Sequence, residues 1–501
     1  MSMTIETEAG RVRGVEHDGG WCFHGIPYGA APCGARRFRP PLAHPGWSGV
    51  LDASTPQLPP AQRSGWVPAG SSNEDCLRLT VTTCTAMGGR LPVLVWIPVG
   101  GFTQGGASIA PFVRARLAQR AEIVLVVVDA RLAALGYLYL EECGGRDWGA
   151  ANNAGLLDVI AALRWVQGNI ERFGGDPNNV TLGGQSAAAT AVHALCAMPA
   201  ARGLFHRAIQ HSSGHGAFFG AADAGTAIAE AYLAQLELQP THSQRLQELP
   251  LARLFAAHMP ALTISVRSHG PRATFCPVVD GDTIPQLPRD AIAAGCMRGI
   301  PLLCGTNLHE AAGSAMFEPR ALDTEGLRER VRNRLGRHRD AADALIEVYR
   351  EAAEDQSPEA LWLAIASDFQ NRVPLIQLAE LHRAHGGATY MFLMRWRSPR
   401  HGIAHHGLEL PLLFGRPELT GGGEDAERVC QQLIATWSSF MRGDPQAPDG
   451  APWPCYDAPR RATLVVDATS TIVEAPLERE RAAWSALPHA WHDVSYGTHG
   501  E

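Results

Sequence analysis

A serine between small residues is the first feature of this sequence that could carry covalent chemistry. The serine lies in the stretch Gly184-Gln185-Ser186-Ala187-Ala188, after an apolar run and directly before a helical pattern. Small neighbours allow a sharp strand-to-helix turn, which presents the serine hydroxyl at the helix N-terminus. The strict pattern is Gly-x-Ser-x-Gly, and Ala188 replaces its last glycine. Serine among small residues is also common at ordinary helix starts, so the pentapeptide alone leaves both interpretations open.

The charged residues narrow the possible chemistry. All 43 lysine-plus-arginine positions of the 501-residue chain are arginine. A chain without lysine cannot form a lysine Schiff base, supply the lysine of a phosphate-binding loop or use a Ser-x-x-Lys pair. The formal net charge of −7 disfavours nucleic acid or an anionic membrane surface as a partner.

The cysteines and the N-terminus lead us to expect a cytoplasmic protein. The 11 cysteines are scattered from Cys22 to Cys455 without zinc-like spacing, and we interpret them as small apolar core residues. The N-terminus has no basic segment followed by an apolar core. No apolar run approaches the roughly 20 residues that a membrane helix needs, so no membrane span is expected.

The elements that must position the serine alternate between strand and helix. Residues 91–97 and 122–129 are β-branched runs that are apolar on both faces, as in strands covered on both sides. Helical patterns cover residues 153–173 and 187–198, with a short predicted strand at 180–182 between them. This alternation predicts an α/β fold with a mostly parallel central sheet and helices on both faces.

A charged and helical stretch later in the chain predicts an inserted cap. The insertion covers roughly residues 312–385. Because no internal repeat and no long linker interrupts the sequence, we expect a single domain over residues 1–501.

Motifs along nearly the whole chain resemble those of one enzyme family. In chain order they are Phe23-His24-Gly25-Ile26-Pro27-Tyr28, Arg37-Phe38-Arg39-Pro40-Pro41, Glu74-Asp75-Cys76-Leu77, Leu163-Arg164-Trp165-Val166-Gln167, Phe173-Gly174-Gly175-Asp176-Pro177, Pro277-Val278-Val279-Asp280-Gly281 and Trp453-Pro454. With these motifs the chain resembles the type-B carboxylesterases, the cholinesterase-like branch of the α/β hydrolases. The resemblance implies the α/β-hydrolase fold and a serine hydrolase that cleaves carboxylic esters without a cofactor.

The resemblance also implies a catalytic triad. The family's acid lies in a Gly-x-Asn-x-x-Glu-Gly segment, which places it at Glu310. The family's histidine precedes Gly-x-Glu-Leu, which selects His406 over the adjacent His405. Ser186 would attack the substrate, His406 would be general base and acid, and Glu310 would orient the imidazole. By resemblance, Ser212 is expected to hydrogen-bond this triad.

The loop that would bind the oxyanion departs from the family pattern. Pro98 and Val99 replace the first two residues of the family's His-Gly-Gly-Gly-Phe. The resemblance assigns the oxyanion hole to the N–H groups of Gly100, Gly101 and Ala187, and one such donor stabilises a transition state by about 3–4 kcal/mol. Because Pro98 lacks an N–H and restricts the preceding residue, we expect weakened or redirected esterase chemistry.

Two further departures bear on the substrate. Gln185 stands where the family commonly has glutamate, which removes an attraction for cationic substrates. No cysteine lies between Cys33 and Cys76, so the disulfide loop of secreted cholinesterases is missing. We therefore expect a small, neutral and fairly apolar ester as substrate. Phe218 and Phe219 could line the acyl side of its pocket or be ordinary core aromatics.

Other interpretations stay open. The altered Pro98-Val99 segment would suit a repurposed enzyme of a biosynthetic or catabolic step, such as acyl transfer, lactone closure, a lyase step, or amide or carbamate hydrolysis. A non-catalytic relative is disfavoured by the intact serine, acid and histidine. His309-Glu310 resembles the start of a zinc-protease helix, but Gly313 occupies the position of the second histidine, so we expect no metal.

Overall fold

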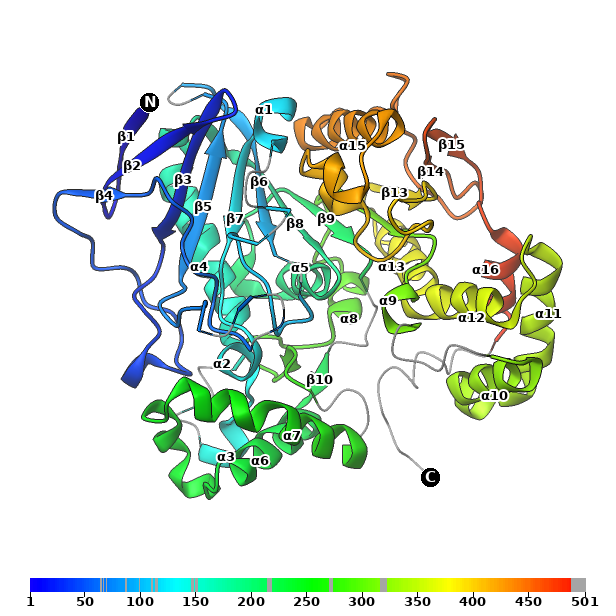
Figure 1. Ribbon diagram of the computed structural model, residues 1–501, viewed down its shortest axis with the longest axis horizontal. Helices are drawn as coiled ribbons and strands as arrows, with labels where there is room; N and C mark the ends of the chain where they lie inside the picture. Colours follow the sequence, from blue (N-terminus) through cyan, green and yellow to red (C-terminus); the bar gives the residue numbers. More distant parts are fainter. Residues whose placement is uncertain are drawn as a thin grey trace.

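One large mixed β-sheet runs through the molecule, with helices on both of its faces (Figure 1). The computed structural model describes residues 1–501 except 64, 66, 69, 86–87, 99, 110, 113–115, 146–147, 149–151, 214–218, 270–273, 316–321 and 488–501. In spatial order the strands are β1 (Ser2–Thr7), β2 (Gly10–His17), β3 (Gly20–Pro27), β5 (Arg78–Thr83), β7 (Val124–Val128), β6 (Leu91–Ile97), β8 (Gly175–Gln185), β9 (Arg207–His211), β12 (Leu302–Asn307), β13 (Thr389–Met394), β14 (Thr463–Val466) and β15 (Thr471–Val473), with β4 (Val50–Asp52) beside β2.

The middle of the sheet is parallel and its two ends are antiparallel. All neighbouring strands from β7 to β14 pair in parallel. Strands β1, β2, β3 and β5 meander antiparallel at one end, and β15 closes the other end. This arrangement confirms the predicted α/β fold with a mostly parallel central sheet.

The strands near the serine are apolar on both faces. Strand β7 is completely buried and six of the seven residues of β6 are buried, as the sequence predicts for strands covered on both sides. Strand β8 is longer than the predicted residues 180–182, because Gly175 also pairs with Leu91 of β6, across a register shift that precedes the regular pairing of Val180 to Gly184. The parallel partner thus extends the strand back through a segment whose glycines and proline predict a turn.

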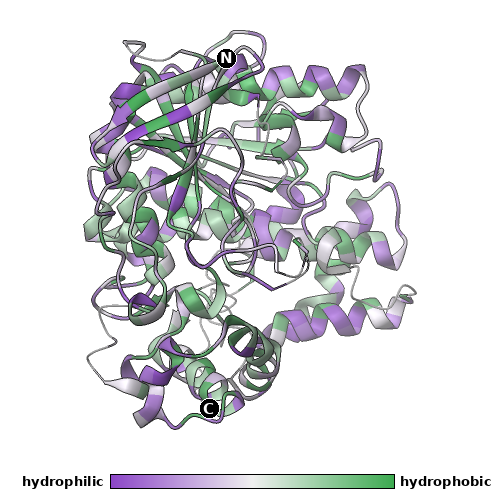
Figure 2. Cartoon of the chain, turned by 60° about the vertical axis from the view of Figure 1, so that its left-hand side comes forward, coloured by the Kyte–Doolittle hydropathy of each residue, from purple (hydrophilic) through white to green (hydrophobic). Residues whose placement is uncertain are grey.

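Alternate residues of β6 belong to two separate apolar cores. Val93 and Val95 face the core that includes helices α2 (Ala133–Tyr137), α4 (Ala154–Asn169), α5 (Ala187–Ala197), α6 (Ala222–Gln235), α7 (Leu251–His269), α8 (Pro288–Ala293) and α13 (Val373–Ala384). Leu94 and Trp96 face the core of α1 (Leu117–Ala121), α14 (Glu409–Leu413) and α15 (Glu424–Arg442). The alternation follows from the two-residue period of a strand. In Figure 2 the central strands are mostly hydrophobic, whereas the outer helices carry hydrophilic segments.

The predicted insertion is helical. Besides α13, it contains α9 (Ala312–Ala315), α10 (Thr324–Leu335), α11 (Ala342–Ala352) and α12 (Pro358–Ser367). Helices α10, α11 and α12 share a third apolar core with Trp484 of α16 (Glu478–Ser485). That the whole chain forms one domain with this region as a cap remains a prediction.

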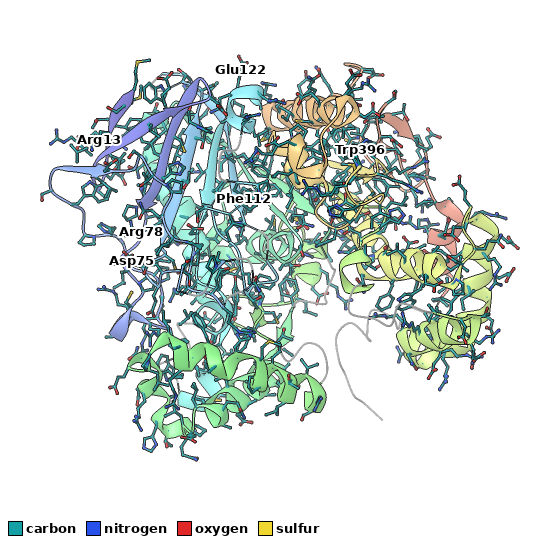
Figure 3. All side chains as sticks on the ribbon, viewed as in Figure 1. Arg13, Asp75, Arg78, Phe112, Glu122 and Trp396 are labelled. Atoms are coloured by element: carbon teal, nitrogen blue, oxygen red, sulfur yellow. The ribbon has the colours of Figure 1, made fainter. Side chains whose placement is uncertain are left out.

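Ion pairs join the first motifs of the chain. The buried Arg37 guanidinium donates to Glu74 Oε2 at 2.8 Å and also to the carbonyl oxygens of Leu246 and Leu249. Next to this pair, Arg78 lies 2.5 Å from Asp75 at the start of β5 (Figure 3). The Arg37 contacts join the loop after β3 to the segment before β5 and to residues 246–249.

The described residues contain no helix with the length and hydropathy needed to cross a bilayer. All eleven cysteines are free thiols, and seven of them are buried.

Candidate active site

The predicted nucleophile lies on a strained turn between β8 and α5. Ser186 has φ +61° and ψ −130°, a conformation that non-glycine residues rarely adopt. The turn leaves no room for a side chain at residue 184, since a Cβ there would lie 2.6 Å from the carbonyl carbon and oxygen of Ala188. The backbone of Ala188 packs against Gly184, which has no side chain. The turn therefore accommodates Ala188 where the pattern has its last glycine. The backbone N–H of Ser186 donates to the His211 carbonyl of the neighbouring strand at 2.9 Å.

The predicted acid is buried and held by two donors. Glu310 lies in the loop after β12 and is 4% exposed. Its Oε1 accepts the Asn307 backbone N–H at 2.6 Å and the Ser212 hydroxyl at 2.5 Å. The Ser212 contact agrees with the expectation from the resemblance. Its other oxygen, Oε2, accepts a hydrogen bond from Nδ1 of His406.

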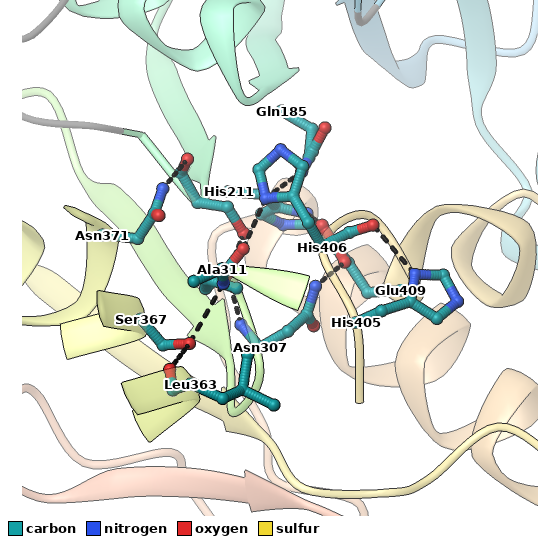
Figure 4. Close-up of polar contacts among 12 residues, drawn as sticks. Gln185, His211, Asn307, Ala311, Leu363, Ser367, Asn371, His405, His406 and Glu409 are labelled. Carbon is teal, nitrogen blue, oxygen red and sulfur yellow. Dashed lines mark hydrogen bonds and ion pairs between the residues drawn. The ribbon is translucent and has the colours of Figure 1, made fainter. Parts of the chain in front are cut away.

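The loop of the predicted histidine is joined to the loop of the acid. Between β13 and α14, His405 forms a β-bridge with His309, and the His309 N–H donates to the Ala404 carbonyl at 2.9 Å. This pairing brings His406 against Glu310. The neighbouring His405 ring instead lies with Nδ1 3.0 Å from its neighbour's carbonyl oxygen (Figure 4). The structure therefore favours His406 over His405.

The His406 imidazole is electrostatically biased toward protonation. Burial alone disfavours its charged form, but the charge and hydrogen bond of Glu310, with a further contribution from Glu409, raise the pKa above 6.5. Because Glu310 accepts from Nδ1, the neutral ring has its lone pair on Nε2.

The Ser186 hydroxyl makes no hydrogen bond to this base. Although the structure describes both residues, they form no hydrogen bond with each other. The side-chain amide nitrogen of Gln185 instead lies over the His406 ring, 3.1 Å from Nε2 and 3.5 Å from Nδ1. Residue 185 immediately precedes the serine, so this contact places the imidazole beside the turn.

A second acid–histidine pair lies buried behind the first. The Nδ1 of His211 is 3.4 Å from Oε1 of Glu409, and the Trp437 indole N–H donates to His211 Nε2 at 2.9 Å. The Asn307 amide donates to Glu409 Oε2 at 2.6 Å. Burial raises the pKa of Glu409, but His211 and Asn307 outweigh it and hold that pKa below 4.5.

No motif considered above predicted this network. Asn307 and Glu409 are fixed positions of the two motifs from which the acid and the histidine were assigned. Those motifs could therefore have pointed to these two members of the network. For His211 and Trp437 the sequence contains no comparable signal.

The predicted oxyanion donors are unoccupied by other protein groups. Within the described part of the chain, no carbonyl or side chain accepts the N–H of Gly100, Gly101 or Ala187. A Cβ on Gly100 would lie 1.8 Å from the Gln104 carbonyl oxygen, so the loop requires glycine there. Val99 lies outside the described residues.

The weaker candidates are not assembled into other sites. Phe219 is buried with its ring 6.0 Å from that of His193, which favours the core-aromatic interpretation, and Phe218 lies outside the described residues. His309 hydrogen-bonds to the backbone N–H of Ala404 at 3.2 Å. In the described ranges, no group of three or more His, Cys, Asp or Glu side chains is placed to hold a metal ion.

Comparison with known proteins decides the family. The model of the carboxylesterase family matches residues 1–484. The chain belongs to the carboxylesterase family.

Relatives of this carboxylesterase align with it over nearly their whole length. It is 30% identical to the para-nitrobenzyl esterase of Bacillus subtilis, covering 95% of this chain and 97% of the relative. It is 32% identical to the phenmedipham hydrolase of Pseudarthrobacter oxydans, covering 94% and 97%. A structure of the Geobacillus stearothermophilus carboxylesterase matches with a TM-score of 0.85 and 33% identity, covering 96% of this chain and 99% of the other. The protein is thus an ester hydrolase with the α/β-hydrolase fold.

Proposed function

We propose that this carboxylesterase cleaves small, neutral and fairly apolar esters through an acyl-enzyme on Ser186. The observation that carries the proposal is the hydrogen bond from His406 Nδ1 to the buried Glu310, next to the strained serine turn. A carboxylate on Nδ1 fixes the tautomer in which Nε2 can accept a proton.

Acylation begins with proton transfer from Ser186. The hydroxyl proton moves to Nε2 of His406 as Oγ forms a bond to the ester carbonyl carbon. The carbonyl oxygen becomes an oxyanion, and the imidazolium is stabilised by Glu310. The imidazolium then donates its proton to the leaving alcohol oxygen as the carbon–oxygen bond of the ester breaks. The alcohol leaves, and the acyl group stays on the serine.

Deacylation repeats the sequence with water. His406 takes a proton from water as the water oxygen attacks the acyl carbon, and it returns the proton to Ser186 Oγ as the acid leaves. The free N–H groups of Gly100, Gly101 and Ala187 are the proposed oxyanion donors in both steps.

The preference for neutral esters rests on Gln185. This fully buried side chain is an amide where a carboxylate would attract cations. Neutral esters should therefore be hydrolysed faster than quaternary-ammonium esters of equal size.

The decisive experiment compares Ser186→Ala with wild type on p-nitrophenyl butyrate. We expect kcat to fall by at least about 10⁴-fold, because the nucleophile is removed. Ser48→Ala, on an exposed position, is the matched control and should keep full activity. Equal rates for Ser186→Ala and wild type would overturn the assignment.

A second candidate function is a repurposed hydrolase acting on amides or carbamates, or catalysing acyl transfer, lactone closure or a lyase step. Two observations support this second candidate function: Pro98 in the oxyanion loop, and the 32% identity to a phenmedipham hydrolase. A substrate panel of matched ester, amide and carbamate isosteres separates the two. The ester proposal requires the highest kcat/KM for the ester.

We also propose a single domain over residues 1–501, with 312–385 as a cap, and a cytoplasmic location. Free thiols at all eleven cysteines support a reducing compartment. One cooperative unfolding transition, and recovery of the protein in the cytoplasmic fraction of producing cells, would support these proposals.

A further inference from the structure

A buried glutamine from a distant loop contacts the segment that carries the proposed oxyanion donors. Gln62 lies between β4 and β5 and is 4% exposed. Its side-chain nitrogen donates to the Gly105 carbonyl at 2.7 Å and to the Pro60 carbonyl at 2.9 Å. Its side-chain oxygen accepts the Gly105 backbone N–H at 3.1 Å. The amide therefore holds both polar backbone groups of Gly105, as a neighbouring strand would.

The peptide between Gln104 and Gly105 connects this contact to the oxyanion loop. Because the N–H and the C=O of a peptide point in opposite directions, the acceptor in Gln62 also fixes the direction of the Gln104 carbonyl. That carbonyl lies directly against Gly100, where an added Cβ would be 1.8 Å from the oxygen. The Gln104 N–H donates in turn to the Gly100 carbonyl at 2.9 Å. Residues 100–104 thus form a closed turn that is attached to Gln62 at its far end.

The loop conformation requires support from outside the loop. Gly100, Gly101 and Phe102 have φ values of +150°, +62° and +61°. A residue with a side chain, such as Phe102, adopts such a value only where the surrounding contacts fix it. The Ala133 N–H donates to the Phe102 carbonyl at 2.7 Å and holds the middle of the loop. Gln62 holds the segment that follows.

The segment that carries Gln62 packs closely on the same loop. A Cβ on Gly106 would lie 2.7 Å from Pro59 and 3.1 Å from Pro60. The backbone N–H of Gln62 donates to the Ser72 hydroxyl at 3.3 Å. The glutamine is therefore itself held in place, as a residue that positions another segment must be.

We propose that Gln62 is a positioning residue for the oxyanion hole, which fixes the 104–105 peptide and through it the N–H groups of Gly100 and Gly101. Gln62 acts through the loop and not on the reacting atoms. Small displacements of these donors are costly, because stabilisation of the developing oxyanion depends on their distance and direction. The inference rests on the proposed function, because it presupposes that these N–H groups bind the oxyanion.

The test replaces Gln62 by methionine, which has a similar length but lacks the amide. With p-nitrophenyl butyrate, kcat should fall by about 10–100-fold and KM should stay within about twofold, because the oxyanion forms only in the transition state. Gln62→Glu keeps an acceptor for the Gly105 N–H but loses both donors, so its loss of kcat should be smaller, about 3–10-fold.

A second measurement follows the oxyanion itself. Ser186 Oγ can form a bond to the carbonyl carbon of an alkyl trifluoromethyl ketone while the hydroxyl proton moves to His406. The carbonyl oxygen becomes an oxyanion, and no leaving group departs. In Gln62→Met the inhibition constant of this ketone should rise by the same factor by which kcat/KM falls. A loss of stability alone would not change this constant for the folded protein.

Gln167→Met is the matched control for lost backbone contacts. The Gln167 amide also donates to two carbonyls, those of Pro177 and Leu204, each at 3.1 Å. This variant should lose stability in urea but keep kcat, KM and the inhibition constant. Gln286→Met, at an exposed position, should keep all four quantities. A loss of kcat in Gln167→Met as large as that in Gln62→Met would reject the positioning role.

The outcomes distinguish this inference from the proposed function. If Ser186→Ala is inactive but Gln62→Met keeps kcat and the inhibition constant, the positioning role is wrong and the proposed function stands. A raised KM at unchanged kcat also rejects the role, because it reports substrate binding and not the oxyanion. If Gln62→Met does not fold, Gln62→Glu decides alone, and an unchanged kcat rejects the role. If Ser186→Ala is fully active, the proposed function itself fails.

Discussion

Asn307 donates a hydrogen bond from its side-chain amide to Oε2 of Glu409 at 2.6 Å. The backbone N–H of the same residue donates to Glu310 at 2.6 Å. One asparagine thus serves two buried carboxylates, at the end of the strand that carries the acid loop. Because an unpaired buried carboxylate is costly, the side-chain bond stabilises the buried Glu409, and the backbone bond stabilises Glu310 in its position.

Replacing Asn307 by alanine should destabilise the protein by about 1–3 kcal/mol, because Glu409 Oε2 loses its donor in a buried site. The free energy of unfolding in urea measures this. Asn178→Ala, close to the surface, is the control and should cost much less. A cost for Asn307→Ala no larger than that of the control would contradict the role of the bond.

Glu310→Gln should lower kcat/KM by about 10³–10⁴-fold while the fold persists. An amide can donate to Nδ1, which favours the wrong tautomer of His406 and leaves no negative charge to stabilise the imidazolium. Kinetics with a p-nitrophenyl ester and circular dichroism check both parts. Glu248→Gln, an exposed position, is the matched control. A loss below tenfold would show that Glu310 does not orient the base.

The activity of the wild type should fall with acid at a pH above 6.5. His406 is a base only when neutral, and Glu310 and Glu409 raise its pKa against the effect of burial. The same raised pKa stabilises the fold fully at pH below 6.5, and this contribution is lost as pH rises through the folded-state pKa. Glu409→Gln should move the acid limb of kcat/KM to lower pH, whereas Glu424→Gln on the surface should not. An acid limb of kcat/KM that is unchanged in Glu409→Gln would exclude electrostatic coupling between Glu409 and His406.

Gly184→Ala should strongly reduce both stability and activity. Its Cβ would lie 2.6 Å from backbone atoms of Ala188, so the serine turn must shift. Overpacking of this kind costs about 1–3 kcal/mol. Gly313→Ala, where a Cβ meets nothing within 4 Å, is the control and should be neutral or slightly stabilising. Thermal unfolding and esterase assays on both variants measure the difference, and equal behaviour of the two would refute the steric argument.

Asp129→Asn should stabilise the protein at neutral pH and not at pH 4. Asp129 is buried and accepts the Ala107 N–H at 2.7 Å, and burial raises its pKa to about 7. The folded state therefore holds a proton that the unfolded state loses between pH 3.8 and 7, so the wild type loses stability as pH rises through that window. The stabilisation of Asp129→Asn relative to wild type should therefore increase as the pH rises from 3.8 to 7, up to about 4 kcal/mol. Unfolding curves at pH 4 and pH 8 test this, and a pH-independent difference would count against it.

The local chemistry of the serine turn could be predicted from the sequence. Small residues around Ser186 indicate a strand-to-helix turn, and the turn is present with its glycine requirement at Gly184. Glu310 and His406 were selected by motif resemblance rather than by any local signal. Their spacing of 96 residues carries no information about contact, because loop closure over such a distance is nearly independent of sequence detail.

The contacts between distant segments could not be predicted in this way. The motif already selected His406 over His405, but the β-bridge between His309 and His405, which sets the register of the two loops, has no signal in the sequence. The contact of Gln185 with the His406 ring, and the pairing of His211 with Glu409, join the ends of the parallel strands β8 and β9 to the segment between β13 and α14.

The sequence by itself determined the alternation of strand and helix, the two-faced burial of the central strands and the sharp serine turn, because these follow from side-chain size, branching and apolar period. Only the tertiary structure decided which polar atoms meet. Hydrogen bonds act over about 3 Å, and their partners here lie on strands and loops brought together by packing of the whole sheet.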